Sequence, residues 1–160
     1  MTKEEQNKAR QLAIGFKDEH VKLLREAMLG YEPAFNFVLE LYSVYRTWDN
    51  VWDGDRKSTK EDINNAFTTL LFDLEQNVFF RANRDVLNAQ IFIAWNAWSD
   101  ANIWCDSDNK YKRCAAFYIK NYCDEIVQLC SFMVGGKEHA RSFSLKLREA
   151  HLEQEDEGLL

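Results

Sequence analysis

The chain has 160 residues, of which 46% are hydrophobic and 14% aromatic, so it carries enough apolar material for one folded core and does not have a disordered composition. Its formal net charge of -6 argues against general nucleic-acid binding, which depends on Lys and Arg neutralising phosphates. No apolar run approaches the roughly 20 residues that a membrane span needs, and residues 1–12 do not form an apolar signal core. We therefore expect a cytoplasmic protein with neither a nucleic-acid nor a membrane partner.

The spacing of apolar residues predicts an all-α fold, because proline occurs once, glycine occurs six times and no useful strand-like alternation is present. We predict a single-domain bundle of five or six helices over residues 1–152, followed by an acidic tail at residues 153–160. The first two expected helices cover about 2–29 and about 34–53. The third opens with a capping box at 58–61 and carries apolar residues to 74, and the fourth covers about 84–104. The fifth runs from the 106–110 loop to Gly135 and Gly136, and the last covers 137 to about 152.

Two of these helices are expected to be innermost. The segments 34–53 and 84–104 carry apolar residues on two faces, which is typical of a helix buried on both sides. All five tryptophans lie in these two segments and are therefore assigned to the core. The 58–74 helix is expected to pack through one stripe, made by Ile63, Phe67, Leu70, Leu71 and Leu74.

The first helix is expected to support self-association. Its stripe of Leu12, Phe16, Leu23 and Met28 continues past what a compact core needs. A two-fold homodimer is the simplest way to cover such a face.

The four cysteines are expected to be reduced thiols. Cys105, Cys114, Cys123 and Cys130 contain no Cys-x-x-Cys pair, and a domain of this size does not need disulfides. A structural zinc site is not expected from these spacings.

Residues 42–55 form the best candidate site, because three carboxylates lie there among four large aromatic rings. If the segment is helical up to Gly54, steps of about 100° per residue place one mixed polar and aromatic face along it. The next segments add polar side chains after the turn and on the 84–104 helix. The full candidate cluster consists of Tyr42, Tyr45, Arg46, Asp49, Asp53, Asp55, Arg56, Asn96 and Asp100.

This cluster has two interpretations. In the first, Asp49, Asp53 and Asp100 hold Mg²⁺ between two helices, and Arg46 or Arg56 clamps a phosphate-ester or pyrophosphate substrate for hydrolysis. In the second, which we favour, the arginines neutralise the aspartates and the network only fixes helix register. No cofactor is expected apart from this Mg²⁺. The sequence contains no phosphate-binding loop, no nucleophile elbow and no Glu-x-x-His pair of a di-iron bundle.

The pattern of residues 42–55 (YSVYRTWDNVWDGD), 58–67 (STKEDINNAF), 77–81 (NVFFR) and 94–102 (AWNAWSDAN), followed by Gly135, Gly136 and Arg148, resembles a set of small helical proteins of tailed bacteriophages. The likeness covers roughly residues 37–148. It departs at Asn50, where the set has a second Asp, and at Val78, where it has Pro; the loss of a carboxylate at Asn50 weakens the metal interpretation. The resemblance implies a phage accessory or virion-associated protein that acts through contact with a protein partner or with itself, in the bacterial host cytoplasm or on the virion. It implies no reaction.

Overall fold

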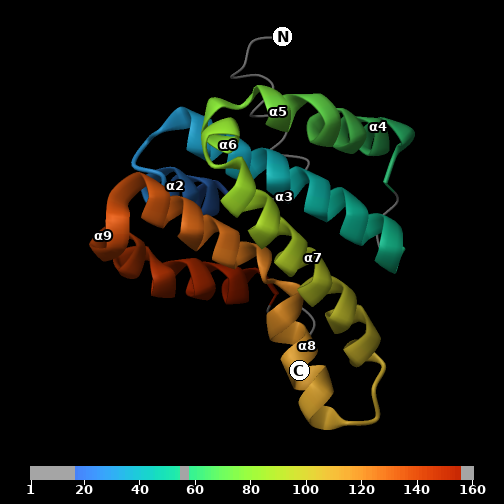
Figure 1. Cartoon of the computed structure of the whole chain (residues 1–160). Helices are drawn as coiled ribbons and strands as arrows, with labels where there is room; N and C mark the ends of the chain where they lie inside the picture. The colour runs from blue at the N-terminus through green and yellow to red at the C-terminus, as the bar shows by residue number, and fades with distance from the viewer. Residues whose placement is uncertain (1–16, 55–57, 156–160) are drawn as a thin grey trace. The chain divides into compact units, whose positions relative to one another are not determined.

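The computed structural model describes residues 17–54 and 58–155, with side chains up to Ala150. All secondary structure in these ranges is helical, which confirms the all-α prediction (Figure 1). None of the helices in these ranges combines the length and apolar character needed to cross a membrane. The chain divides into two compact units, residues 1–82 and residues 83–160. The single-domain assignment stays a prediction.

The predicted number of five or six helices is too low. If the continuous run α4 (Lys60–Thr68), η1 (Thr69–Asp73) and α5 (Leu74–Gln76) counts as one helix, the described residues form seven. One addition is α6 (Val78–Ala82), which lies where a simple break was expected. The predicted fifth helix is also interrupted at Asn121 and Tyr122, and its second part is joined to the predicted sixth helix, so that this region forms α8 (Lys110–Lys120) and α9 (Cys123–Glu155).

In the first unit, α3 (Glu32–Asp53) contacts α2 (Asp18–Ala27), α4 and α6. Its bounds follow the sequence signals. Pro33 lies in the first turn, where its missing N–H costs nothing, and Gly54 ends the helix with a left-handed φ of 69°. The N-terminal half is buried, as predicted for this helix, and supplies much of the core through Ala34, Phe35, Phe37, Val38, Leu39 and Leu41.

Backbone geometry and side-chain contacts together define the short turn between α2 and α3. Leu29 and Gly30 both adopt positive φ values, so the chain reverses within a few residues. Arg25 then forms an ion pair with Glu32, and its guanidinium lies 4.1 Å from the centre of the Phe35 ring.

Over its described residues, the first helix does not expose the apolar stripe that the sequence predicted. Met28 is fully buried, as are Leu24 and Ala27, while Leu23 is half-buried. Leu12 and Phe16, the other members of the expected stripe, lie outside the described residues. The described part of the stripe is therefore at least partly covered within the fold, and the dimer through the first helix stays a prediction.

The segment before α6 is fixed by one side chain. Asn77 has extended backbone, and its Oδ1 accepts hydrogen bonds from the N–H groups of Phe79 (2.9 Å) and Phe80 (3.2 Å). Its Nδ2 donates to the carbonyl of Pro33 at 2.9 Å. The cap thereby places both rings against α3, where Phe80 stacks on Phe37 at 5.6 Å between ring centres.

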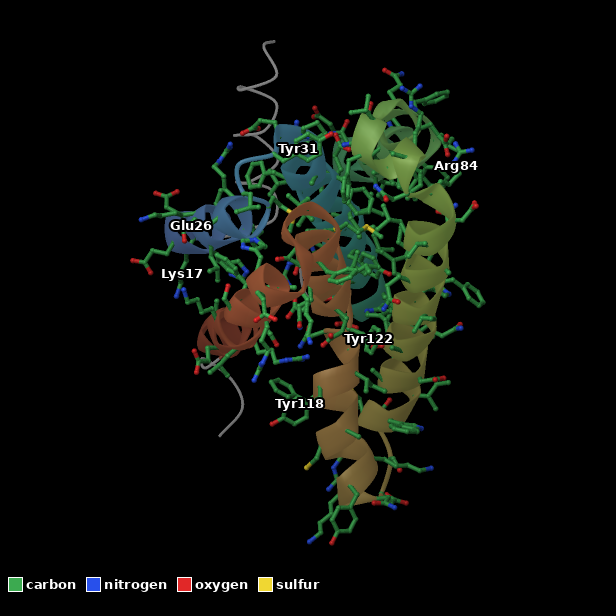
Figure 2. All side chains as sticks on the ribbon, turned by 60° about the vertical axis from the view of Figure 1, so that its left-hand side comes forward. Lys17, Glu26, Tyr31, Arg84, Tyr118 and Tyr122 are labelled. Carbon is green, nitrogen blue, oxygen red and sulfur yellow. The ribbon has the colours of Figure 1, made fainter. Side chains whose placement is uncertain are left out.

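In the second unit, α7 (Arg84–Cys105) and α8 lie side by side as a helical hairpin (Figures 1 and 2). The Asn109 side chain accepts a hydrogen bond from the Tyr111 N–H at 2.9 Å and so caps the start of α8. Tyr118 extends away from α8 and is exposed (Figure 2).

Helix α7 is buried on one side only, and the prediction of a helix buried on two sides is wrong. Its buried residues are Leu87, Ala94, Trp98 and Ala101. Phe92, Ile93 and Trp95 are exposed because they lie on other faces of the same helix.

Helix α9 turns back on itself, as Figure 1 shows. The reversal occurs at Gly136, whose φ of 77° and ψ of -175° belong to a region that essentially only glycine adopts. This is where the sequence predicted a helix to end. Arg148 reaches Glu125 across the reversal at 2.6 Å. The helix continues to Glu155, so it includes the first part of the predicted tail, while residues 156–160 lie outside the described residues.

Candidate functional site

The predicted polar cluster is divided between elements. Tyr42, Tyr45, Arg46, Asp49 and Asp53 all lie on the C-terminal half of α3, which is helical up to Gly54 as the prediction required. Tyr42, Tyr45 and Asp49 are half-buried, whereas Arg46 and Asp53 are exposed. This mixed face therefore borders solvent, and its charges do not have to be held in a dry interior.

The remaining members of the cluster do not complete a metal site within the described residues. Asn96 and Asp100 lie one turn apart on α7 in the second unit, and both are exposed. Asp55 and Arg56 lie outside the described residues. Over residues 17–54 and 58–155, no group of three His, Cys, Asp or Glu side chains is arranged to hold a metal ion. A common cluster of Asp49, Asp53 and Asp100 stays a prediction.

The N-cap of α4 lies one residue later in the sequence than predicted. Thr59 is the N-cap: its Oγ1 accepts a hydrogen bond from the Asp62 N–H at 3.1 Å, and Asp62 Oδ2 accepts one from the Thr59 N–H at 2.8 Å. The predicted box used Ser58 and Glu61. Both pairs have capping-box spacing, but the side chain at the end of the structural box is Asp rather than the Glu or Gln of the usual pattern.

The α4–η1 segment has its polar side turned inward. None of the residues of α4 is buried, and Asp62 and Ala66 are only half-buried. In η1, Thr69 is 5% exposed, and its hydroxyl donates to Asp73 Oδ2 at 3.2 Å. The side of α4–η1 that faces the rest of the first unit is therefore made mainly of small or polar side chains.

The apolar side of the same segment is exposed. Phe67 is 63% exposed and Leu71 is 61% exposed, so most of each side chain contacts water. We call this surface the outer face of α4–η1, and its members are Ile63, Phe67, Leu70, Leu71 and Phe72. Of the predicted inward stripe, only Leu74 is buried, so the predicted orientation of this helix is wrong.

A π-helical turn explains how Leu74 differs from its neighbours. The five residues of η1 have i→i+5 geometry, so residues five apart share a side. Thr69 and Leu74 are five apart and both are buried. With ordinary α-helical spacing, Thr69 and Leu74 would point in different directions and could not both face the core. The outer face would then be rotated relative to the core.

More exposed rings lie on the neighbouring helix. Trp48 and Trp52 are one turn apart on α3 and are exposed, as is Val51 between them. The assignment of all tryptophans to the core is wrong, since Trp98 is the one that is buried. Exposed apolar side chains in the first unit thus gather on α4–η1 and on the last turns of α3.

The composition of the outer face determines what it can do. Its five members are aliphatic or aromatic and carry no acid, base, nucleophile or metal ligand. Acidic side chains outnumber basic ones over residues 60–76, with Lys60 against Glu61, Asp62, Asp73 and Glu75. The outer face therefore offers apolar contact area and no side chain with acid, base, nucleophilic or metal-ligating chemistry.

Sequence reasoning found four of the five members of the outer face but assigned them to the interior, and it did not include Phe72. Hydrophobic periodicity identifies a stripe along a helix and does not say which neighbour covers it. One signal was present: the opposite side of the helix carries Ala66 and Thr69, which supply little apolar area to a core. Comparisons of the chain with protein-family models, curated proteins and solved structures found no match.

Proposed function

We propose that the protein works by protein–protein contact through the outer face of α4–η1, as an accessory or virion-associated protein of a bacteriophage. The observation that carries the proposal is the orientation of this helix, with its polar side inward and five apolar side chains outward. The phage context comes from the sequence pattern of residues 42–55, 58–67, 77–81 and 94–102.

The free energy of burial supports a contact role. Covering a side chain such as Phe or Leu contributes about 1.5–3 kcal/mol relative to leaving it exposed. A helix that keeps Phe67, Leu70 and Leu71 in water therefore forgoes several such contributions during folding. A partner that covers the outer face recovers them on binding. Contiguous apolar surface of this kind marks interaction sites on soluble proteins.

Site-specific photo-crosslinking in bacterial cells tests the proposal. A photoreactive amino acid in place of Leu71 is expected to give a covalent adduct of one discrete mass, because the outer face is covered by a specific protein. The matched control is the same amino acid in place of Phe92, an exposed ring that lies between the exposed Asn88 and Asn96 on α7. Phe92 is about as exposed as Leu71 but lies outside the outer face of α4–η1. No adduct at Leu71, or equal adducts at both positions, would contradict the proposal.

A Mg²⁺-dependent hydrolase is the second candidate, because Asp49 and Asp53 lie one turn apart on α3 and Asp53 is exposed. A metal present at about 100 times its Kd adds about 2.7 kcal/mol of stability, which raises the Tm of a protein this size by on the order of 5–10 °C. We expect no such rise when Mg²⁺ or Mn²⁺ is titrated. A rise that Asp53→Asn abolishes would favour the hydrolase instead.

A further inference from the structure

The two halves of α9 differ in how deeply their side chains are buried. The half before the reversal contains five buried side chains, those of Asp124, Ile126, Val127, Cys130 and Ser131. In residues 137–150, which we call the strap, Leu147 is the only buried side chain, and most of the others are exposed. Segments with few buried contacts open locally at a lower free energy than the rest of a protein. The strap is therefore the less firmly held half of α9.

A single residue joins the strap to the rest of the helix. Gly136 is the one residue within α9 whose backbone is not helical. The residues on both sides of it are helical, so a change of φ and ψ at Gly136 is enough to move the strap as a unit. Protein hinges are commonly a few residues at the ends of elements that absorb such a change. The reversal in α9 has the construction of a hinge.

Contacts at both ends of the strap hold it closed. Near the hinge, the His139 side chain lies so close to Gly135 that a Cβ atom added at Gly135 would come within 2.3 Å of it. Near the other end, Leu147 is buried and Arg148 pairs with Glu125 across the reversal. Both partners of this ion pair are partly exposed to solvent, which weakens such a contact.

We propose that the strap opens and closes about Gly136 while residues 123–134 stay packed, as a conformational device of the second unit. The proposal goes beyond the proposed function and does not depend on it. In the open state, the Arg148–Glu125 ion pair and the burial of Leu147 are lost in one step. Opening is therefore cooperative, whereas fraying loosens a helix progressively from its end.

The first test is amide hydrogen exchange of the full chain, measured by mass spectrometry of peptides. Amides in residues 140–150 are expected to share one level of protection, at least about tenfold below that of residues 126–134, because a single opening exposes them all. Equal protection on the two sides of Gly136 would overturn the inference. A protection that declines steadily toward residue 155 would also overturn it, since the helix would then only fray.

A substitution at the hinge tests its role. Gly136→Ala is expected to speed exchange of the strap by about 5- to 150-fold, because the closed backbone is strained for any residue except glycine and the open state relieves that strain. The matched control is Gly54→Ala, a second glycine at positive φ, which should leave exchange of the strap unchanged. An added Cβ meets no atom within 4 Å at either position, so both variants test backbone conformation alone. Unchanged exchange of the strap in Gly136→Ala would contradict the hinge.

The ion pair provides a second test that does not alter the hinge. Arg148→Gln and Glu125→Gln are each expected to speed exchange of the strap by about 1.5- to 5-fold and to leave residues 126–134 unchanged. The double variant is expected to match the single variants, because all three lack the same contact. Arg141→Gln, which changes another exposed cation of the strap, serves as the control. Independent, additive effects of Arg148→Gln and Glu125→Gln, or no effect of either, would show that this pair does not close the strap.

Discussion

At the scale of single residues, the cysteines differ from one another in how far they are buried. Cys130 is fully buried, and burial raises the pKa of its thiol well above the ordinary value because the charged thiolate is poorly solvated there. Cys105 and Cys114 are exposed. Since the thiolate is the reactive form, the buried Cys130 is expected to react far more slowly than the two exposed thiols in the folded protein.

We predict that iodoacetamide at pH 8 modifies Cys105 and Cys114 quickly and Cys130 only when the protein unfolds. Peptide mass spectrometry at successive times measures this directly, and addition of urea supplies the unfolded control. Modification of Cys130 at the same rate as Cys105 in the folded protein would show that the thiol is accessible and ionised.

The raised pKa also gives the direction of a pH effect on stability. The folded protein holds the Cys130 proton more tightly than the unfolded chain, in which the thiol has a pKa of 9.0. The contribution is therefore fully present below that pH, and the free energy of unfolding falls as the pH rises above it.

At the scale of elements, Asn77 does more than end one helix and start another. It caps α6 through two backbone N–H groups and ties the cap to the first turn of α3 through the Pro33 carbonyl. Both Phe79 and Phe80 are buried, so the placement of this five-residue helix determines how part of the first core packs.

We predict that Asn77→Ala lowers the free energy of unfolding by about 1–2 kcal/mol, because a cap and a partly buried hydrogen bond are lost together. Asn77→Asp is expected to cost less, since the acceptor remains and only the donor to Pro33 is removed. The measurement is urea denaturation. Asn88→Ala, at an exposed position on α7, serves as the control and should change stability by no more than about 0.5 kcal/mol. An unchanged midpoint for Asn77→Ala would mean that the cap contributes nothing.

Helix ends with a local cause could be predicted from the sequence. Pro33 and Gly54 mark the two ends of α3 because their backbone preferences act at the residue itself. The orientation of α4 could not be predicted in the same way. It depends on the Thr59–Asp62 cap and on a π-helical turn with a Thr69–Asp73 hydrogen bond, and neither follows from periodicity.

At the scale of the whole molecule, the fold class follows from scarce glycine and proline and from repeated apolar spacing, which are properties of the whole sequence. The degree of burial of each helix does not follow from them. Helix α7 is more apolar than α3, yet Phe92 and Trp95 remain exposed. The candidate metal cluster could not be predicted from local rules either. It requires Asp49 and Asp100 to lie close together, and local rules do not determine the relative positions of their two helices.

The reversal at Gly136 has a consequence for the order in which the chain acquires its structure. A straight helix of 33 residues would be about 50 Å long and would need distant segments to cover it. Because α9 instead folds against itself, and α7 pairs with the next helix in the chain, much of the packing in residues 83–160 joins segments that are close in sequence. Helical proteins with such local contacts fold in microseconds to milliseconds, as short loops close at little entropic cost. Each helical pair can therefore form without waiting for contacts with segments that are distant in the sequence.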